Sequence, residues 1–369
     1  MILFEFVRFK NNISGLLIVF ICQLRFEEKN EEVGKTKGLL PRPSLYYGIS
    51  EQSRKRLETI ELLCRSNLEK ARTKGERDYH LVSAFGDYDY PMGTITSGSE
   101  YIRRAPENQD FRNFIQKTPR LTASELIFNE SLHYFRKYGE PMSHPGALPK
   151  YFTEGGMKLT DKIRTYDGRT ITVKDLFSLP DQEAKKVVET AGTKSIDASW
   201  YLHALMANGL EGYTFEVNGE KYDVHKLAEK VEKSLEELTE GYKKWIEHYG
   251  LNDKEIGFRS MHYRHNLAHG LSALAIYYGE TGKTKKLKEL VIDTVEQLKD
   301  SKDLIDIAHC LEVIGYAVKY VSLTKQQKKE VENAIQRVHD IMVAQKGDKE
   351  TSTPSIGHLY NAIRLIKNS

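Results

Sequence analysis

The sequence has few cysteines and almost no excess charge. Its 369 residues include three cysteines, Cys22, Cys64 and Cys310, which are too few and too widely spaced for a disulfide framework or a cysteine-based zinc site. The 55 lysines and arginines nearly balance the 52 aspartates and glutamates, and the formal net charge is +3. Because nucleic-acid-binding surfaces usually carry a strong basic excess, we expect no nucleic-acid partner.

An apolar run long enough to cross a membrane is also lacking near the start of the sequence. Residues 13–24 are apolar, but a transmembrane helix needs about 20 such residues. Arg8 and Lys10 precede this short run, an arrangement typical of a signal peptide or a signal anchor. We predict that residues 1–35 are an export signal and linker. The protein would then be periplasmic or extracellular, with membrane contact only through this segment.

Residues 36–120 are predicted to hold one helix and an irregular segment. Leu57, Ile60 and Leu68 recur at helical spacing, which indicates a helix over residues 51–73. The following fifty residues are rich in glycine, aspartate and tyrosine and show no helical period. We predict that they form long loops.

Two kinds of helix alternate in residues 121–369, which we predict to be one domain. The first kind is apolar on nearly every side, as in residues 303–321, and such helices are buried. The second kind carries one apolar stripe among charged residues, as in residues 285–299, and such helices pack by one face. The predicted inner helices lie near residues 122–138, 197–209, 260–279, 303–321 and 355–366.

Local signals mark several helix starts and two turns. Thr122 and Glu125 have the spacing of a capping box, and we place other helix starts at Asp197, Ser260 and Thr353, the last of which precedes a proline. The dipeptides at residues 167–168 (Asp-Gly) and 218–219 (Asn-Gly) lie between β-prone flanks and predict type I′ hairpins. The fold class predicted is therefore all-α: an α/α toroid of about five helix pairs, with small β-hairpins in the inner-to-outer connections.

Histidines recur at similar depths in the predicted inner helices. His203, His269, His309 and His358 lie about one and a half to two and a half turns after the proposed helix starts, so we expect them to surround one end of a central cavity. A histidine in this position can also simply pack its ring and bond a loop carbonyl. Both interpretations stay open from the sequence.

Metal binding is one functional interpretation of these histidines. His265 and His269 are four residues apart, and His262 is three residues before His265, so all three share a helix face. A zinc site would also need a ligand from another helix, for which Asp306 and Glu312 are candidates. The spacing matches no specific zinc motif. We therefore assign no metal ligand, and no cofactor is identified.

Acid–base chemistry on a sugar is the second interpretation. Arginine or asparagine can neutralise a uronate carboxylate, and tyrosine or histidine can then remove the acidified proton. We predict that the catalytic residues are Tyr263, Arg264, His265 and His269. The predicted substrate-binding residues are Trp200, His203, Asn266, His309 and His358.

These features together resemble the α/α-toroid polysaccharide lyases. The resemblance rests on the alternating helices, the 21 tyrosines and the inventory of Asn, His, Tyr and Arg, and terpenoid-cyclase-like toroids share the helical part. The resemblance covers residues 120–369 at the level of helix arrangement, and no sequence motif matches residue by residue. The Asn-His pair of those lyases is present here only in the reverse order, as His265-Asn266. It implies an exported protein that acts on or binds a polysaccharide or another small polar ligand, by β-elimination at a uronate. A glycoside hydrolase using carboxyl groups such as Glu130 and Glu312, or a non-catalytic scaffold that binds a glycan or protein on its concave face, are the alternatives.

Overall fold

The protein is mainly α-helical. The computed structural model describes residues 44–76, 78–90, 108–138, 145–189, 196–249, 253–344 and 352–369. Across these ranges the few strands form two small antiparallel hairpins, so the all-α prediction is confirmed. None of the helices described has the length and apolar character needed to cross a membrane. The predicted export segment, residues 1–35, lies outside the described residues.

The helices follow one another closely along the chain, and each hairpin is inserted between two of them. The elements in chain order are α1 (Leu45–Gly48), α2 (Glu51–Thr73), α3 (Tyr79–Phe85), α6 (Gln109–Lys117), α7 (Ala123–Tyr138), α8 (Ala147–Glu154), β1 (Lys162–Arg164), β2 (Thr170–Thr172), the 3₁₀ helix η1 (Val173–Phe177), α9 (Asp181–Glu189), α10 (Ile196–Ala207), β3 (Phe215–Val217), β4 (Glu220–Tyr222), α11 (Val224–Tyr249), α12 (Asp253–Glu280), α13 (Thr284–Asp300), α14 (Leu304–Ala317), α15 (Lys325–Ala344) and α16 (Thr353–Lys367).

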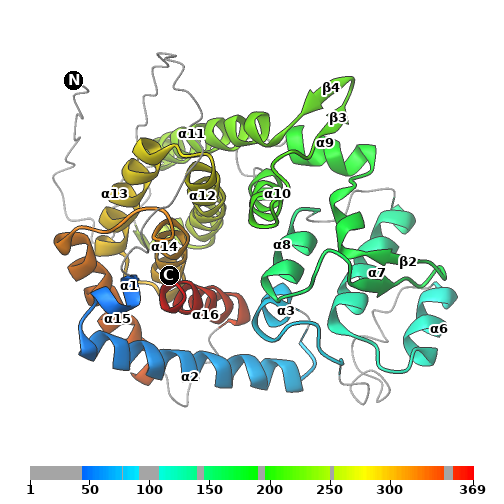
Figure 1. The fold of residues 1–369 in the computed structure, drawn as a ribbon, viewed down its shortest axis with the longest axis horizontal. Helices are drawn as coiled ribbons and strands as arrows, with labels where there is room; N and C mark the ends of the chain where they lie inside the picture. The colour runs from blue at the N-terminus through cyan, green and yellow to red at the C-terminus, as the bar shows by residue number, and fades with distance from the viewer. Residues whose placement is uncertain are drawn as a thin grey trace.

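Six helices contact one another in a closed circuit at the centre of the molecule. The contacts run from α8 to α10, α12, α14 and α16, and α3 then contacts both α16 and α8. Figure 1 shows these helices around the centre. The circuit is therefore completed by a short helix from the N-terminal part of the described chain.

A second set of helices packs outside this circuit. Helix α11 contacts α10 and α12, α13 contacts α12 and α14, and α2 contacts α15 and α16 (Figure 1). The burial of the two sets differs as their sequences predict. Every residue from Ile196 to Met206 in α10 is buried, whereas α13 buries the stripe that includes Leu287, Val291 and Leu298. Charged residues fill the rest of α13, so only one of its faces can pack.

Several predicted helix starts differ from the structure. Helix α12 begins at Asp253, two turns before Ser260, and Asp197 lies inside the first turn of α10. The capping box before α7 is present, because Thr122 and Glu125 bond reciprocally at 3.1 and 3.4 Å. The predicted inner helix near residues 122–138 is α7, which contacts α3, α6 and β1 and is not one of the six helices of the circuit. Helix α8 takes the predicted place beside α10.

The prediction of long loops after α2 is wrong for two segments. Helix α2 has the predicted bounds, but α3 and α6 follow within the stretch assigned to loops. Asp78 caps α3 by accepting the backbone N–H of His80, and Gly86 ends it at a φ of 75°, a conformation that favours glycine. Since α3 packs on α8 and α16, the tertiary contacts stabilise a helix too short to show a period.

One of the two predicted turn types is confirmed. Between β3 and β4, Asn218 and Gly219 have φ values of 53° and 81°, as a type I′ turn requires. Between β1 and β2 the connection is the longer segment 165–169, and only Gly168 of the Asp-Gly pair has a positive φ. There Asp167 accepts a hydrogen bond of 2.8 Å from Arg169 Nε. This bond stabilises the longer loop, which stands where a two-residue turn was predicted.

Candidate metal centre

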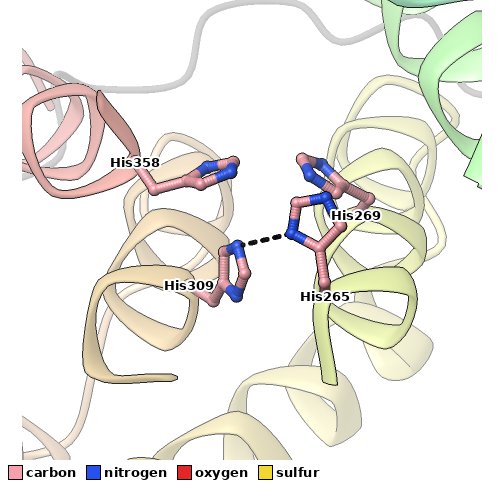
Figure 2. A group of neighbouring side chains, drawn as sticks. All are labelled: His265, His269, His309 and His358. Atoms are coloured by element: carbon pink, nitrogen blue, oxygen red, sulfur yellow. Dashed lines mark hydrogen bonds between the residues drawn. The ribbon is translucent and has the colours of Figure 1, made fainter. Parts of the chain in front are cut away.

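Four histidine side chains from three central helices converge on one point. His265 and His269 come from α12, His309 from α14 and His358 from α16, and one ligand nitrogen of each lies within 4.8 Å of the others. Figure 2 shows the four rings facing one another across the space between the helices. We call these four residues the histidine quartet. The predicted convergence of His269, His309 and His358 is therefore found, and His265 joins them.

Burial favours the neutral form of three of the four quartet members. His269, His309 and His358 are 2%, 3% and 1% exposed. Burial is the main reason that the pKa of each of these three lies well below the ordinary value of 6.5, and the neighbouring imidazoles lower it further. A neutral imidazole has one nitrogen with a free electron pair, which is the form that binds metal ions.

Contacts inside the quartet are between imidazoles. His265 Nδ1 lies 3.3 Å from His309 Nε2, the pair joined by the dashed line in Figure 2. His269 Nε2 and His309 Nδ1 are buried and have no hydrogen-bond partner among the described residues. A buried polar atom without a partner is uncommon in folded proteins and needs an explanation.

A carboxylate fixes the orientation of one quartet member. Glu312 Oε2 lies 2.9 Å from His358 Nδ1, and Glu312 Oε1 accepts a bond of 2.6 Å from Asn361. Because a carboxylate only accepts, His358 Nδ1 carries the proton and His358 Nε2 keeps its free electron pair. This carboxylate–histidine arrangement is the usual support of a metal-binding imidazole.

A fifth histidine contacts the quartet, and it comes from a helix that was not among the predicted inner helices. His80 of α3 is 8% exposed, and its Nε2 lies 3.1 Å from His358 Nε2. Its Nδ1 lies 2.6 Å from Asp78 Oδ1. Burial opposes ionisation of Asp78, but the charge and hydrogen bonds of His80 outweigh it and lower the pKa of Asp78.

His203, the remaining predicted histidine, belongs to a different cluster. It lies in α10 with its Nε2 3.2 Å from Glu154 Oε1, a distance of an ion pair but without the orientation of a hydrogen bond. Glu154 also lies 2.8 Å from Lys150 Nζ and accepts a bond of 2.8 Å from the hydroxyl of Tyr316. We call Lys150, Glu154, His203 and Tyr316 the Glu154 cluster.

Opposing charges stabilise the ionised form of Glu154. Burial alone would raise the pKa of Glu154, but the positive charge of Lys150 and the contact with His203 hold it well below its ordinary value. The pKa of His203 is lowered, first by burial and then by the charge of Lys150. The cluster therefore combines one carboxylate and one ammonium in the interior, where each charge depends on the other.

The other predicted site residues lie around the quartet in different ways. The ring centroid of Trp200 is 5.0 Å from that of His269, so Trp200 borders the quartet. Arg264 forms ion pairs with the buried Asp306 and with Asp303 of the next inner helix. Asn266 is buried, and Tyr263 lies in α12, but its side chain is outside the described part of the structure. The arginine predicted to neutralise a uronate is thus already paired with carboxylates.

A small pocket lies beside the quartet. It is lined by residues of α12, α13 and α14 that include Arg264, Asp306 and His309. His309 is the quartet member that this pocket and the quartet share.

Sequence reasoning missed His80, Lys150 and Glu154. His80 is the second residue after the capping Asp78 and precedes the helix-ending Gly86, and this start and stop pattern could have indicated α3. Helix α8 is only eight residues long, too short for an apolar period to reveal that Lys150 is buried.

Comparison with protein-family models, curated proteins and solved structures finds no significant match.

Proposed function

We propose that the protein binds a divalent transition-metal ion through His265, His269, His309 and His358. The observation that carries this proposal is the convergence of four ligand nitrogens within 4.8 Å. Nitrogens at about 2.1 Å from a common ion in tetrahedral geometry are roughly 3.4 Å apart. The imidazoles therefore need to close by about an ångström, which is within the reach of side-chain rotation.

The donor set favours ions that prefer nitrogen. Imidazole suits Zn²⁺, Cu²⁺, Ni²⁺ and Fe²⁺, whereas Mg²⁺ and Ca²⁺ prefer oxygen ligands. The buried Nε2 of His269, which has no hydrogen-bond partner among the described residues, could gain one on metal binding. A structural role for the quartet as simple packing would leave this atom without a partner.

We further propose that the circuit of inner helices with its outer layer is an α/α toroid. The closed sequence of helix contacts and the alternation of fully buried and one-sided helices support this assignment. The metal would lie near the axis of that toroid, held by three successive inner helices. The fold then brings together ligands that are 93 positions apart in sequence at most, from His265 to His358.

The proposed activity is metal-assisted chemistry on a polysaccharide or another small polar ligand. A divalent ion held by the quartet would polarise a carboxylate or carbonyl oxygen, or lower the pKa of a bound water, if one coordination position stayed open to the ligand. This chemistry suits β-elimination at a uronate or hydrolysis. Trp200 lies beside His269 but is buried in the core with Tyr151 and Ile196, so it presents no exposed face on which a sugar could stack. A non-catalytic, metal-stabilised scaffold that binds a glycan or protein is the alternative, favoured by the burial of the quartet. Export remains a prediction from the sequence.

Metal analysis tests the binding proposal. Chelated and repurified protein would be titrated with Zn²⁺ against a chromogenic chelator, and with Co²⁺ followed by visible absorption. We expect one tight site in the wild type, loss of the site in the His269→Ala/His309→Ala variant, and no loss in the His339→Ala control on outer helix α15. Equal binding by all three proteins would contradict the proposal.

Activity is tested separately. Metal-loaded and chelated protein would be incubated with a panel of uronate polymers, and the unsaturated product of β-elimination followed by its ultraviolet absorbance. A metal-dependent increase supports the lyase. If the absorbance stays flat while reducing ends accumulate, the enzyme is a hydrolase, and if neither changes for a polymer that binds, the scaffold is supported.

A further inference from the structure

In the pair formed by His80 and His358, the same ring nitrogen, Nε2, of each residue faces the other. The two Nε2 atoms are 3.1 Å apart and the ring centroids 4.5 Å apart, although the residues are separated by 278 positions. His80 belongs to α3 near the start of the described chain, and His358 belongs to α16 near its end. The pair thus lies where α3 completes the circuit of inner helices.

Hydrogen bonds fix the tautomer of both rings. Asp78 lies 2.6 Å from Nδ1 of His80, and Glu312 lies 2.9 Å from Nδ1 of His358. Carboxylates accept hydrogen bonds, so both Nδ1 atoms carry a proton, and Nε2 of each ring is the nitrogen left for a second proton or a metal ion. The two Nε2 atoms face each other across 3.1 Å. This contact is repulsive unless a proton, which makes one ring cationic, or a metal ion lies between the nitrogens.

The charged groups connected to this pair favour a metal ion over a proton between the two nitrogens. A chain of contacts links Asp78, His80, His358 and Glu312, and continues through Asn361 and Tyr316 to Glu154 and Lys150. This network places three acidic side chains, Asp78, Glu312 and Glu154, against one lysine, Lys150, so its acidic groups outnumber its lysine by two before any charge on the imidazoles is counted. A buried excess charge is unfavourable. One divalent cation neutralises it, whereas one shared proton leaves a negative charge.

From these observations, and resting on the metal site proposed above, we propose that His80 is a fifth ligand of the ion and that metal binding fastens α3 to α16, closing the ring of inner helices. Both Nε2 atoms can lie about 2.1 Å from one ion at an N–metal–N angle of roughly 95°, which a five-coordinate zinc ion accepts. The metal then joins the N-terminal helices of the described chain to its last helix.

Gly357 makes this approach possible. A Cβ added at Gly357 would lie 2.3 Å from Cβ of His80, well inside van der Waals contact. Replacement by alanine should therefore push α3 and His80 away from α16 without removing any ligand nitrogen. This gives a second variant that acts on the same contact by a different route.

The test measures zinc affinity and amide hydrogen exchange on the full chain. The variants are His80→Gln and Gly357→Ala, with His339→Gln as the matched control. We expect both test variants to bind Zn²⁺ at least tenfold more weakly than the wild type, because one ligand is lost or displaced. In the wild type, Zn²⁺ should slow exchange in α3 by tenfold or more, and this slowing should be absent in His80→Gln.

The outcomes separate the two proposals. If His80→Gln binds Zn²⁺ as tightly as the wild type and zinc leaves exchange in α3 unchanged, His80 is not a ligand although the quartet still binds metal. If the wild type binds no metal, the metal site itself fails, and a shared proton holds the histidine pair together. The exchange comparison of wild type with and without Zn²⁺ needs no variant, so it decides the matter even where a variant fails to fold.

Discussion

The histidine quartet and the Glu154 cluster are two groups of buried polar side chains that the sequence pattern did not distinguish. In both, the imidazoles are buried and their pKa values are lowered mainly by burial. They differ in what faces the rings. His203 lies beside a carboxylate that also pairs with Lys150, whereas the quartet members face other imidazoles. The first arrangement balances its own charges, and the second contains buried ring nitrogens that have no partner among the described residues.

The largest expected difference between the two groups is in metal affinity. Structural zinc sites with four ligands bind with about 10–16 kcal/mol, or roughly 3 kcal/mol for each ligand. The His269→Ala/His309→Ala variant should therefore bind Zn²⁺ on the order of 10⁴-fold more weakly. His203→Ala should leave the zinc affinity within about threefold, a difference of less than 1 kcal/mol, as measured by chelator competition. A comparable loss in His203→Ala would show that the two groups are one site.

The Glu154 cluster should dominate stability instead. Glu154→Gln leaves the buried ammonium of Lys150 without its carboxylate, and breaking a buried ion pair in this way typically costs about 3–5 kcal/mol. Chemical denaturation of the metal-free protein would measure it. The Lys150→Met/Glu154→Gln variant, which removes both charges, should recover most of the loss. If the single variant is as stable as the wild type, the two charges are not mutually dependent.

Glu312 links the two groups, and its replacement should have an intermediate effect. Glu312→Gln preserves the shape of the side chain but removes the charge that orients His358 through Nδ1. Loss of such a supporting carboxylate usually weakens metal binding by about 10–100-fold. The zinc titration that tests this should show unchanged stoichiometry. An affinity equal to that of the wild type would mean that His358 is oriented by packing alone.

The smallest effect, counted for one histidine and one pH unit, is on the stability of the metal-free protein, which should fall in two separate pH ranges. The folded-state pKa values of His269, His309 and His358 lie below the ordinary 6.5, so the unfolded chain takes up protons first. Stability should be full above about pH 6.5 and fall below it, by up to about 1.4 kcal/mol per pH unit for each histidine. Glu154, with its lowered pKa, should contribute a further loss only below its ordinary value of 4.5.

Denaturation at a series of pH values would separate these ranges. His203→Ala should retain most of the loss below pH 6.5, since three other lowered pKa values remain, whereas the His269→Ala/His309→Ala variant should show a clearly smaller slope. A wild-type stability that is constant from about pH 7 to pH 5, where an ordinary histidine gains its proton, would contradict the neutral state of the quartet.

The sequence predicted the convergence of histidines better than it predicted the reason. The register argument placed the start of one inner helix at Ser260, but α12 starts at Asp253, so the depths from the helix starts do not match. The histidines still meet, because inner helices that are apolar on all sides must pack against each other. Burial pattern, rather than register, was the informative signal.

The residues that the sequence did not reveal are those whose positions depend on distant contacts. His80 reaches the quartet only because α3 docks between α8 and α16, and no local pattern encodes a contact across 278 positions. Lys150 lies in a short helix between apolar residues, where its burial depends on Glu154 one turn later. Local propensity and periodicity describe single elements, whereas the charge balance of this site arises from the closure of the whole ring.

The most direct measurement is the X-ray absorption spectrum of the zinc-loaded full chain. A metal centre built by the quartet and His80 predicts a first shell of four to five nitrogen ligands at about 2.0–2.1 Å, with the outer scattering pattern of imidazole rings. A first shell of oxygen atoms with no imidazole scattering, or a protein that retains no zinc after desalting, would contradict the central claim.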